Sequence, residues 1–380
     1  MADFSTLGAT AKHRRLAGAG MAALVTALAA VLIFLLPSVD GSGSGRGGGA
    51  KAPAVKPADT AANSSLTVQV KAPGKVPMVA AIWTDEWPKT DFSRSSVDLR
   101  EIRSGGPPKD GIPSIDSPKF IAVGDVTGVK DTEPVISLRI GSDARAYPLS
   151  VLMWHEIVND TVGGVPVAVT FCPLCNAAVV FNRRLEGRVL DFGTTGKLRR
   201  SDLVMYDRQT ESWWQQFLGE AIIGQLTGKR LEFLPSRIES FARFKARFPK
   251  GRYLVPNNPH TRRYGANPYA GYDSLARPWL YKGAMPKGIA PLARVVSIGK
   301  QAWSLDLVRE KKRITHGDYV ITWEAGQNSA LDKANIAEGR DVGNVVVQKN
   351  TPQGLVDAVH GVDFAFAFHA FHPGGVIHTK

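Results

Sequence analysis

The chain is organised around the stretch Phe171-Cys172-Pro173-Leu174-Cys175-Asn176, which contains the only two cysteines among 380 residues. Residues 165–171 before it are rich in β-branched side chains and too few for a typical helix, so they predict a strand. Residues 177–181 and 188–192 after it flank the turn signal Glu186-Gly187, which predicts a β-hairpin. The cysteine pair is therefore expected in a turn between strands.

A Cys-x-x-Cys pair in such a turn has several chemical meanings. In thioredoxin-like enzymes the pair begins a helix, whose N-terminus lowers the thiol pKa, and no helical pattern follows Cys175. The pair can bind zinc or copper(I), cycle between thiols and a disulfide, or form a structural disulfide. Two buried thiols without a chemical role are the simplest alternative.

Two thiolates supply half of a tetrahedral zinc shell, so a metal site needs further ligands. Our preferred set is Cys172, Cys175 and His155, with copper or zinc as the ion. A lone histidine in an apolar stretch is more often structural, which is the alternative for His155. Other side chains that could complete the shell are Asp202, Asp207, His316, His369, His372 and, for copper(I), the thioether of Met205.

The segment Ser201–Arg208 is the densest polar stretch of the chain. Polar side chains alternating with aromatic ones are typical of a pocket wall, where a few polar groups orient a ligand. Its candidate cofactor-binding residues are Asp202, Met205, Tyr206, Asp207 and Arg208. The alternative is an ordinary amphipathic segment that buries its apolar side chains.

The first fifth of the chain predicts a membrane anchor and a tether. Basic residues 12–15 precede the apolar run 16–36, which is as long as the roughly 20 residues that cross a bilayer. Since basic flanks stay in the cytoplasm, we expect a cytoplasmic tail at 1–15 and a single transmembrane helix at 16–36. A cleaved signal peptide is the alternative, although its apolar core is usually shorter. Residues 37–75 are rich in Gly, Pro and Ala and predict a disordered linker.

Residues 76–380 are then expected as a folded domain outside the inner (cytoplasmic) membrane, on its periplasmic or extracellular side. The formal charge of the chain is +13, with 44% hydrophobic and 21% charged residues, which is a globular composition. Nucleic acid is not an expected partner, because the domain lies on the wrong side of the membrane and carries no groove-reading motif. The expected partners are the membrane and an unidentified small molecule or redox protein.

Short strands separated by turn signals predict a β-rich α+β fold with antiparallel sheets or a barrel-like core. Residues 135–138, 146–149 and 164–171 resemble 295–298, 302–305 and 317–323, which suggests an internal duplication with halves at about 130–192 and 290–350. Chance similarity of two hairpins is the alternative. The alternation of Phe364, Phe366 and Phe368 predicts a further buried strand.

Five motifs in order resemble the domain-of-unknown-function family numbered 3179, over about residues 109–371. They are Gly111–Pro113, Ala144–Leu149, Trp154–Asp160, Phe171–Cys175 and Ser201–Arg208. The resemblance implies that His155, the cysteine pair and the Ser201–Arg208 block belong to one site. It implies no reaction, and His369 departs from the aromatic residue expected there.

Three functions remain open from the sequence. The first is a membrane-anchored metal-binding or thiol-redox protein of the cell envelope. The second is a non-catalytic binding module of the envelope in which the cysteines form a structural disulfide. The third is a hydrolase or transferase that uses His155 with Asp202 or Asp207, which no nucleophile or phosphate-binding motif supports.

Overall fold

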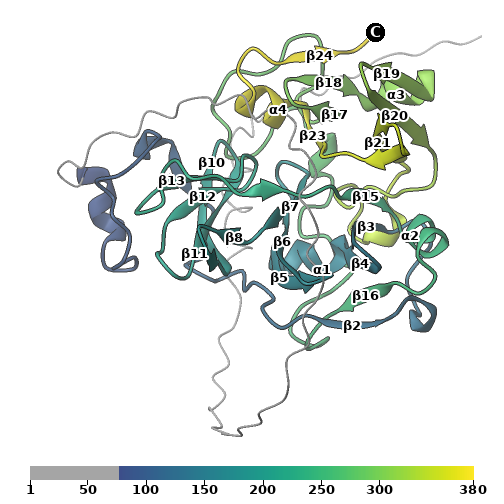
Figure 1. The fold of residues 1–380 in the computed structure, drawn as a ribbon. Helices are drawn as coiled ribbons and strands as arrows, with labels where there is room; N and C mark the ends of the chain where they lie inside the picture. The colour runs from purple at the N-terminus through teal and green to yellow at the C-terminus, as the bar shows by residue number, and fades with distance from the viewer. Residues whose placement is uncertain (1–76) are drawn as a thin grey trace, which may run out of the picture. The chain divides into compact units, whose positions relative to one another are not determined.

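The computed structural model describes residues 77–380, and β-strands are the main secondary structure in this range. The strands form five sheets of four or five strands each and one two-stranded hairpin. Figure 1 shows these mostly antiparallel sheets placed side by side, in the manner of propeller blades. Short 3-10 turns connect them at Met78–Trp83, Leu99–Glu101, Val123–Asp125, Tyr272–Ser274 and Ile336–Glu338.

Two of the sheets form the part of the domain that holds the cysteine pair. One has the order β15 (Arg237–Ser240), β3 (Pro134–Ile140), β4 (Asp143–Pro148), β16 (Arg252–Val255) and β2 (Lys119–Ala122). The other has the order β14 (Glu232–Phe233), β7 (Ala177–Asn182), β6 (Val165–Cys172) and β5 (Ile157–Val162). Helix α1 (Leu149–His155) joins β4 to β5, and helix α2 (Phe241–Arg247) joins β15 to β16.

Two further sheets repeat this arrangement in the C-terminal half. The first has the order β23 (Gly361–Phe364), β17 (Arg294–Ile298), β18 (Gln301–Ser304) and β24 (Val376–His378). The second has the order β19 (Arg313–His316), β20 (Tyr319–Glu324), β21 (Asn344–Thr351) and β22 (Gly354–Asp357). Helix α3 (Leu305–Lys311) joins β18 to β19, and helix α4 (Ala365–Phe371) joins β23 to β24.

The two halves agree in topology and in detail. In each half the strand after the second helix pairs in parallel, β16 with β4 and β24 with β18. The helices α1 and α3 both end at a residue with positive φ, Glu156 at 56° and Lys312 at 61°. The backbone oxygen of each accepts a hydrogen bond from the next hairpin, from the amide of Phe171 (2.8 Å) or of Trp323 (3.1 Å). The repeated order extends to β16 and β24, beyond the expected halves, and a common origin stays a prediction.

Four of the five strands of the fifth sheet lie in an insertion that only the first half has. Its order is β1 (Ile102–Ser104), β10 (Phe192–Arg199), β11 (Asp202–Asp207), β12 (Trp213–Gln215) and β13 (Glu220–Ile223). Strands β10 to β13, with the small hairpin of β8 (Arg184–Leu185) and β9 (Arg188–Val189), fall between β7 and β14. The corresponding connection in the second half, between β21 and β22, consists of residues 352–353.

One large hydrophobic core includes side chains of both halves, among them Phe171, Phe181, Val296 and Ile321, all fully buried. Each such side chain stabilises the fold by roughly 1.5–3 kcal/mol relative to exposure. A smaller core joins the start of the described chain to the fifth sheet, where Trp83 packs on Trp213 with ring centres 5.2 Å apart. The cysteine turn therefore stands on a rigid framework.

Two details of the expected fold are wrong. The core is not barrel-like, because each large sheet is open, with two different strands at its edges. Phe366 is buried but lies in α4 and not in a strand, since β23 ends at Phe364. Helix α4 is buried on nearly all sides and therefore has no polar face. Phenylalanines can then stand at alternate positions of this helix, which imitates the pattern of a strand.

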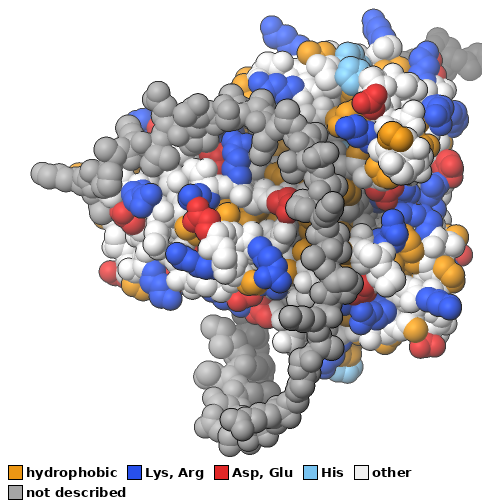
Figure 2. Space-filling model, in the orientation of Figure 1, with side chains coloured by type: hydrophobic (Ala, Val, Ile, Leu, Met, Phe, Trp, Pro, Cys, Tyr) orange, Lys and Arg blue, Asp and Glu red, His pale blue; other side chains and the backbone are white. Residues whose placement is uncertain are grey.

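The expected tail, transmembrane helix and linker all lie outside the described residues. Within 77–380, none of the helices has the length and hydrophobicity that a bilayer span requires. Figure 2 shows Lys and Arg side chains interspersed with Asp and Glu over the visible face, without a single basic stripe.

Candidate functional site

The cysteine pair lies in the tight connection between β6 and β7, as the sequence predicted. The two strands pair from Val167 with Asn182 to Cys172 with Ala177, and residues 173–176 make the turn. Within it the amide of Cys175 donates to the carbonyl of Cys172 at 3.3 Å, and Asn176 has a φ of 51°. Asn tolerates this left-handed conformation better than most residues. The turn thus holds both cysteines on one short, hydrogen-bonded segment.

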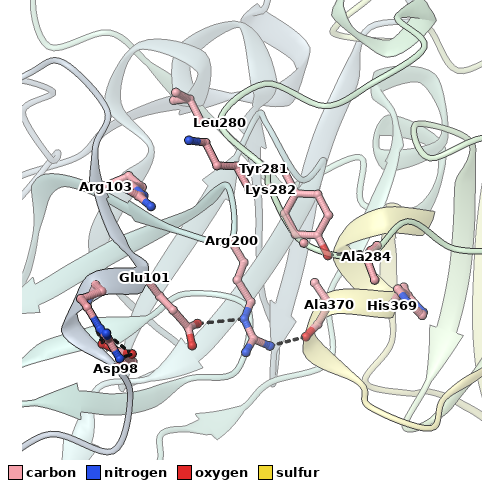
Figure 3. Close-up of a pocket in the computed structure, with 12 residues that line it drawn as sticks. Asp98, Glu101, Arg103, Arg200, Leu280, Tyr281, Lys282, Ala284, His369 and Ala370 are labelled. Carbon is pink, nitrogen blue, oxygen red and sulfur yellow. Dashed lines mark hydrogen bonds and ion pairs between the residues drawn. The ribbon is translucent and has the colours of Figure 1, made fainter.

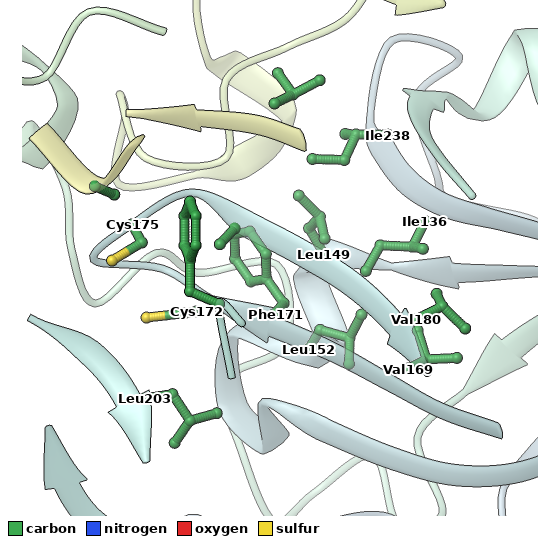
Figure 4. Close-up of a cluster of buried hydrophobic side chains, with 14 of the residues drawn as sticks. Ile136, Leu149, Leu152, Val169, Phe171, Cys172, Cys175, Val180, Leu203 and Ile238 are labelled. Carbon is green, nitrogen blue, oxygen red and sulfur yellow. The ribbon is translucent and has the colours of Figure 1, made fainter. Parts of the chain in front are cut away.

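Both cysteines are free thiols and buried, Cys172 at 2% exposure and Cys175 at 0%. Figure 4 shows their sulfur atoms on the same side of the turn, directed away from aliphatic side chains such as Leu149 and Val169. Each thiol donates to the carbonyl oxygen of Ser201, over 3.9 Å from Cys172 and 3.6 Å from Cys175. Ser201 belongs to the turn between β10 and β11, so the inserted sheet covers the thiols.

Asp202, the first residue of β11, completes the cluster. One ligand atom from each of Cys172, Cys175 and Asp202 can be chosen so that all three lie within 4.8 Å of one another. The Oδ2 atom of Asp202 accepts from Gln215 Nε2 (2.6 Å) and from the amide of Phe217 (3.0 Å). Its Oδ1 atom is buried and makes no hydrogen bond of normal geometry among residues 77–380, although the thiols of Cys172 and Cys175 lie close enough to lower the pKa of this carboxyl. A buried polar atom without a partner is rare in native proteins and therefore marks this position for a ligand.

Two more buried carboxyl groups influence this cluster electrostatically. Burial, with repulsion from Asp202, raises the pKa of Glu156 to about 8. Burial also raises the pKa of Asp363 to about 8, although a hydrogen bond from Ser297 opposes the shift. The pKa of Asp202 itself is raised to about 6, again by burial. Burial without a neighbouring cation disfavours the charged forms of all three carboxyl groups, so Glu156 and Asp363 are mostly neutral at pH 7, whereas Asp202 is mostly charged.

The thiols respond to the same environment. Burial raises the pKa of Cys172, and the charges of Asp202 and Glu156 add to the rise. Burial raises the pKa of Cys175 well above its usual value, with further contributions from Cys172, Asp202 and Asp363. At neutral pH both sulfur atoms therefore carry protons, and a positive ion among them would reverse that preference.

His155 is not part of this cluster, although the sequence placed it among the metal ligands. Its Nδ1 lies 2.7 Å from the carbonyl oxygen of Pro113, and its Nε2 lies 2.8 Å from the hydroxyl of Tyr264. Burial lowers the pKa of the ring. With both nitrogen atoms engaged, His155 ties two loops together. His316, His369 and His372 are likewise absent from the group of close ligand atoms found within the described residues.

The remaining residues of the Ser201–Arg208 block have structural contacts. Met205 is fully buried in the main core, while Asp207 accepts from Trp214 Nε1 at 3.0 Å and from Thr210. The hydroxyl of Tyr206 donates to Asp110, and Arg208 pairs with Asp116 at 2.5 Å. Successive residues of β11 point to opposite faces of the sheet, so the block could not converge on a single site. Of this block the structure brings Ser201, through its backbone carbonyl, and the side chain of Asp202 to the cysteines.

Glu156 and Asp363 are the members of the site that the sequence reasoning missed. Glu156 directly follows His155 in the quoted motif, and the positive φ at the end of α1 was not recognisable from the sequence. Asp363 lies nearly two hundred residues from the cysteines, and a hydrogen bond of 2.9 Å from the amide of Phe364 to the carbonyl of Cys175 brings it near. An acidic residue between apolar neighbours in β23 was the available signal.

The arrangement fits a thiophilic metal ion. Two thiolates and one carboxylate are common zinc ligands, and thiolates also bind copper(I). Zn–S bonds of about 2.3 Å place neighbouring donor atoms about 3.5–4 Å apart, so small side-chain rotations close the shell. The unpartnered Oδ1 of Asp202 is then satisfied by the ion.

The comparisons with known proteins identify the family without assigning a reaction. A search of curated proteins and a search of solved structures each gave no significant match. The model of the family described as "Protein of unknown function (DUF3179)" matches residues 109–375. This range includes every residue of the thiol–carboxylate cluster, and the chain therefore belongs to the DUF3179 family.

Proposed function

We propose that the protein binds one thiophilic metal ion, zinc or copper(I), through Cys172, Cys175 and Asp202. The observation that carries this proposal is the three-residue cluster of ligand atoms within 4.8 Å, buried and with one carboxylate oxygen unpartnered among the described residues. Soft thiolates set the class of metal. The carboxylate favours zinc over copper(I), because zinc accepts oxygen ligands and copper(I) prefers sulfur.

Glu156 lies outside the group of ligand atoms within 4.8 Å, but its electrostatic interaction with Asp202 makes it the candidate for the fourth position of a tetrahedral shell. It is buried, and no neighbouring group lowers the pKa of its carboxyl. A positive ion would offset the repulsion between Glu156 and Asp202 and favour both charged forms. A shell of four protein ligands is typical of structural zinc sites, whereas a site of three keeps a position for water or substrate.

A metal role is better supported than thiol redox chemistry or a disulfide. The thiolate is the reactive form in thiol–disulfide exchange, and burial holds both thiols in the protonated form. The two cysteines are also free. A metal ion would instead displace both protons on binding, because its ligands must be deprotonated.

The test is metal analysis with thiol counting on the full-length protein purified without oxygen. The expected result is one zinc or copper ion per chain, and its loss in Cys172→Ser or Cys175→Ser. The His155→Ala variant is the matched control and should keep the metal, because that ring is engaged elsewhere. Wild-type protein that stays metal-free after reduction and reloading with zinc or copper(I) would refute the proposal.

The pH dependence of binding tests the ligand set. Since both thiols are protonated at neutral pH, the logarithm of the apparent association constant should rise by about two per pH unit between pH 6.5 and 7.5. A slope of about three would add Glu156 to the shell, because its pKa is about 8. Glu156→Gln should then return the slope to two. A slope near zero would contradict thiolate ligation.

The proposal also places this domain outside the inner membrane, tethered by residues 16–36. Basic residues before an apolar run of bilayer length support this orientation. A periplasmic reporter enzyme fused after Lys380 should be active, and a reporter that works only in the cytoplasm should be inactive. The opposite pair of results would refute the topology and leave the metal site untouched.

A further inference from the structure

A cavity of about 680 Å³ is lined in part by Arg200, which directly precedes Ser201 and Asp202 in the chain. Its volume is within the range of about 300–1,000 Å³ that is typical of small-molecule sites. Figure 3 shows its walls, which come from the segment before β1, the β10–β11 turn, the loop after β16 and helix α4. The lining residues are Asp98, Arg100, Glu101, Arg103, Arg200, Leu280, Tyr281, Lys282, Gly283, Ala284, His369 and Ala370.

The charge of this lining is predominantly positive. Arg100 pairs with Asp98 at 2.7 Å, and Arg200 pairs with Glu101 at 3.0 Å. Arg103 and Lys282 have no carboxylate within ion-pair distance in the part of the chain that the structure describes. No carboxylate of the described residues therefore pairs with Arg103 or Lys282, and both could pair with the negative charge of a ligand.

An apolar surface accompanies these cations. Leu280 lines the cavity with a φ of 55° and is 52% exposed. A left-handed conformation costs a non-glycine residue about 1–3 kcal/mol and is concentrated at ligand sites. The ring of Tyr281 packs on Phe366 at 5.0 Å, and its hydroxyl donates to the carbonyl of Ala284 at 2.9 Å. With its hydroxyl already bonded, Tyr281 can offer a ring surface to a ligand.

The cavity wall and the cover of the thiols are consecutive residues. Arg200 and Ser201 form the β10–β11 turn with φ values of 52° and 69°. The guanidinium of Arg200 donates to the carbonyl of Ala370 at 2.6 Å on the cavity side. The carbonyl of Ser201 accepts from the two thiols, and its hydroxyl donates to the carbonyl of Trp279. A molecule in this cavity would thus lie next to the proposed metal site.

We propose that this cavity binds a small organic anion. Its carboxylate or phosphate group pairs with Arg103 and Lys282, and its apolar part lies against Leu280 and Tyr281. Arg favours such oxyanions because its planar guanidinium can donate two parallel hydrogen bonds. The site does not depend on an ion at the cysteines, so it goes beyond the metal-binding function.

The test is calorimetric titration of the full-length protein with 1-naphthyl phosphate and 1-naphthoate. Neutral 1-naphthol and inorganic phosphate serve as matched probes that lack the charge or the apolar part. We expect saturable binding of one or both naphthyl anions, at least tenfold tighter than naphthol and phosphate. The preferred anion distinguishes a phosphate ligand from a carboxylate ligand.

Variants locate the binding and separate it from the metal site. Arg103→Ala and Lys282→Ala should each weaken it about three- to tenfold, and the double variant should abolish it. Lys250→Ala removes an exposed cation that does not line the cavity and should have no effect. Cys172→Ser should lose metal but keep anion binding.

Four results would overturn the proposal. They are no saturable binding of either naphthyl anion, equal binding of naphthol, equal weakening by Lys250→Ala, or loss of anion binding in Cys172→Ser.

Discussion

The two halves of the domain place an acidic and a basic residue at one equivalent position. Glu156 and Lys312 each follow the first helix of their half, with φ values of 56° and 61°. Lys312 extends its ammonium group over the ring of Trp323, 4.1 Å from the centroid, which stabilises its charge. Glu156 is buried near Asp202, and its pKa is raised to about 8. The two halves therefore share the backbone conformation at this position, but the chemical properties of their side chains differ.

The loops that connect equivalent strands differ between the two halves even more than the residues at the helix ends. Strands β6 and β7 are joined by residues 173–176, with Cys172 at the end of β6 and Cys175 in the turn, whereas β20 and β21 are joined by residues 325–343. Cys172 corresponds to Glu324, an exposed residue that pairs with Arg243. Asp202 comes from a sheet that the second half lacks. The candidate site is therefore built from what the first half adds to the common topology.

Buried carboxylates show the same contrast. Asp273, in the loop before β17, pairs with Arg294 at 2.9 Å and with Arg340 at 2.8 Å, and it accepts from Ser329. Burial alone would raise its pKa, but these two arginines hold the pKa below its usual value. Asp202 is equally buried without a cationic partner among the described residues. In the C-terminal half, arginines of the protein itself thus balance the charge of Asp273. In the half that contains the cysteines, the charge of Asp202 could be balanced by a bound cation.

The largest expected effect concerns the pH dependence of stability in the metal-free protein. Glu156 and Asp363 have folded pKa values of about 8, far above those of unfolded carboxyl groups. The stability from such raised values is complete at low pH and is lost as pH rises through the folded pKa. Between pH 6.5 and 8, where histidines are mostly neutral, the free energy of unfolding should fall by about 3.3 kcal/mol.

Chemical denaturation of the chelator-treated full-length protein measures this slope. Glu156→Gln should halve it, and saturating zinc should reduce it, because the ion favours the ionised ligands. If the free energy of unfolding rose from pH 6.5 to 8, the carboxyl groups near the cysteines would not have raised pKa values. The contrast with the buried carboxylate of the other half would then be wrong.

The next effect compares the two buried aspartates directly. Asp273→Asn leaves Arg294 buried without its charge partner and should destabilise the protein by about 3 kcal/mol. Asp202→Asn should stabilise the metal-free protein at pH 7 by up to about 3 kcal/mol, since it removes a buried charge whose pKa is about 6. Denaturation midpoints of the two variants, measured with chelator, test the opposite signs. If Asp202→Asn destabilised the protein as much as Asp273→Asn, the charge of Asp202 would be stabilised by the protein without a bound cation.

The smallest effect concerns the helix ends. Lys312→Met should lower the free energy of unfolding by about 0.5–1 kcal/mol, the usual contribution of an exposed cation–π contact. Lys312→Arg keeps a cation over Trp323 and is the matched control. Neither variant should change the metal content, in contrast to Glu156→Gln if Glu156 is the fourth ligand. A larger metal loss in Lys312→Met than in Glu156→Gln would break the comparison.

Local patterns predicted much of the framework. The strand–turn–strand around the cysteines is confirmed because β-branched runs and turn residues act over a few positions. The arrangement of sheets as separate blades depends on contacts between distant strands, which no local pattern encodes.

The candidate site was predictable only in part, for the same reason. Asp202 was among the expected ligand residues, and it joins the cysteines because the β10–β11 turn covers them. His155 was expected there as well, but Pro113 and Tyr264 engage both of its ring nitrogens. These partners lie 42 and 109 residues away along the chain, so the sequence around His155 could not reveal them.

The insertion that supplies Asp202 leaves and re-enters the framework at neighbouring points. Strand β7 before it and strand β14 after it are hydrogen-bonded partners, with Asn182 opposite Glu232 and Phe181 opposite Phe233. Closing such a gap needs only a short turn, as residues 352–353 do in the other half. The segment is therefore a natural unit for grafting: exchanging it between members of the family would transplant one metal ligand and one cavity wall together, without changing the register of the host sheet.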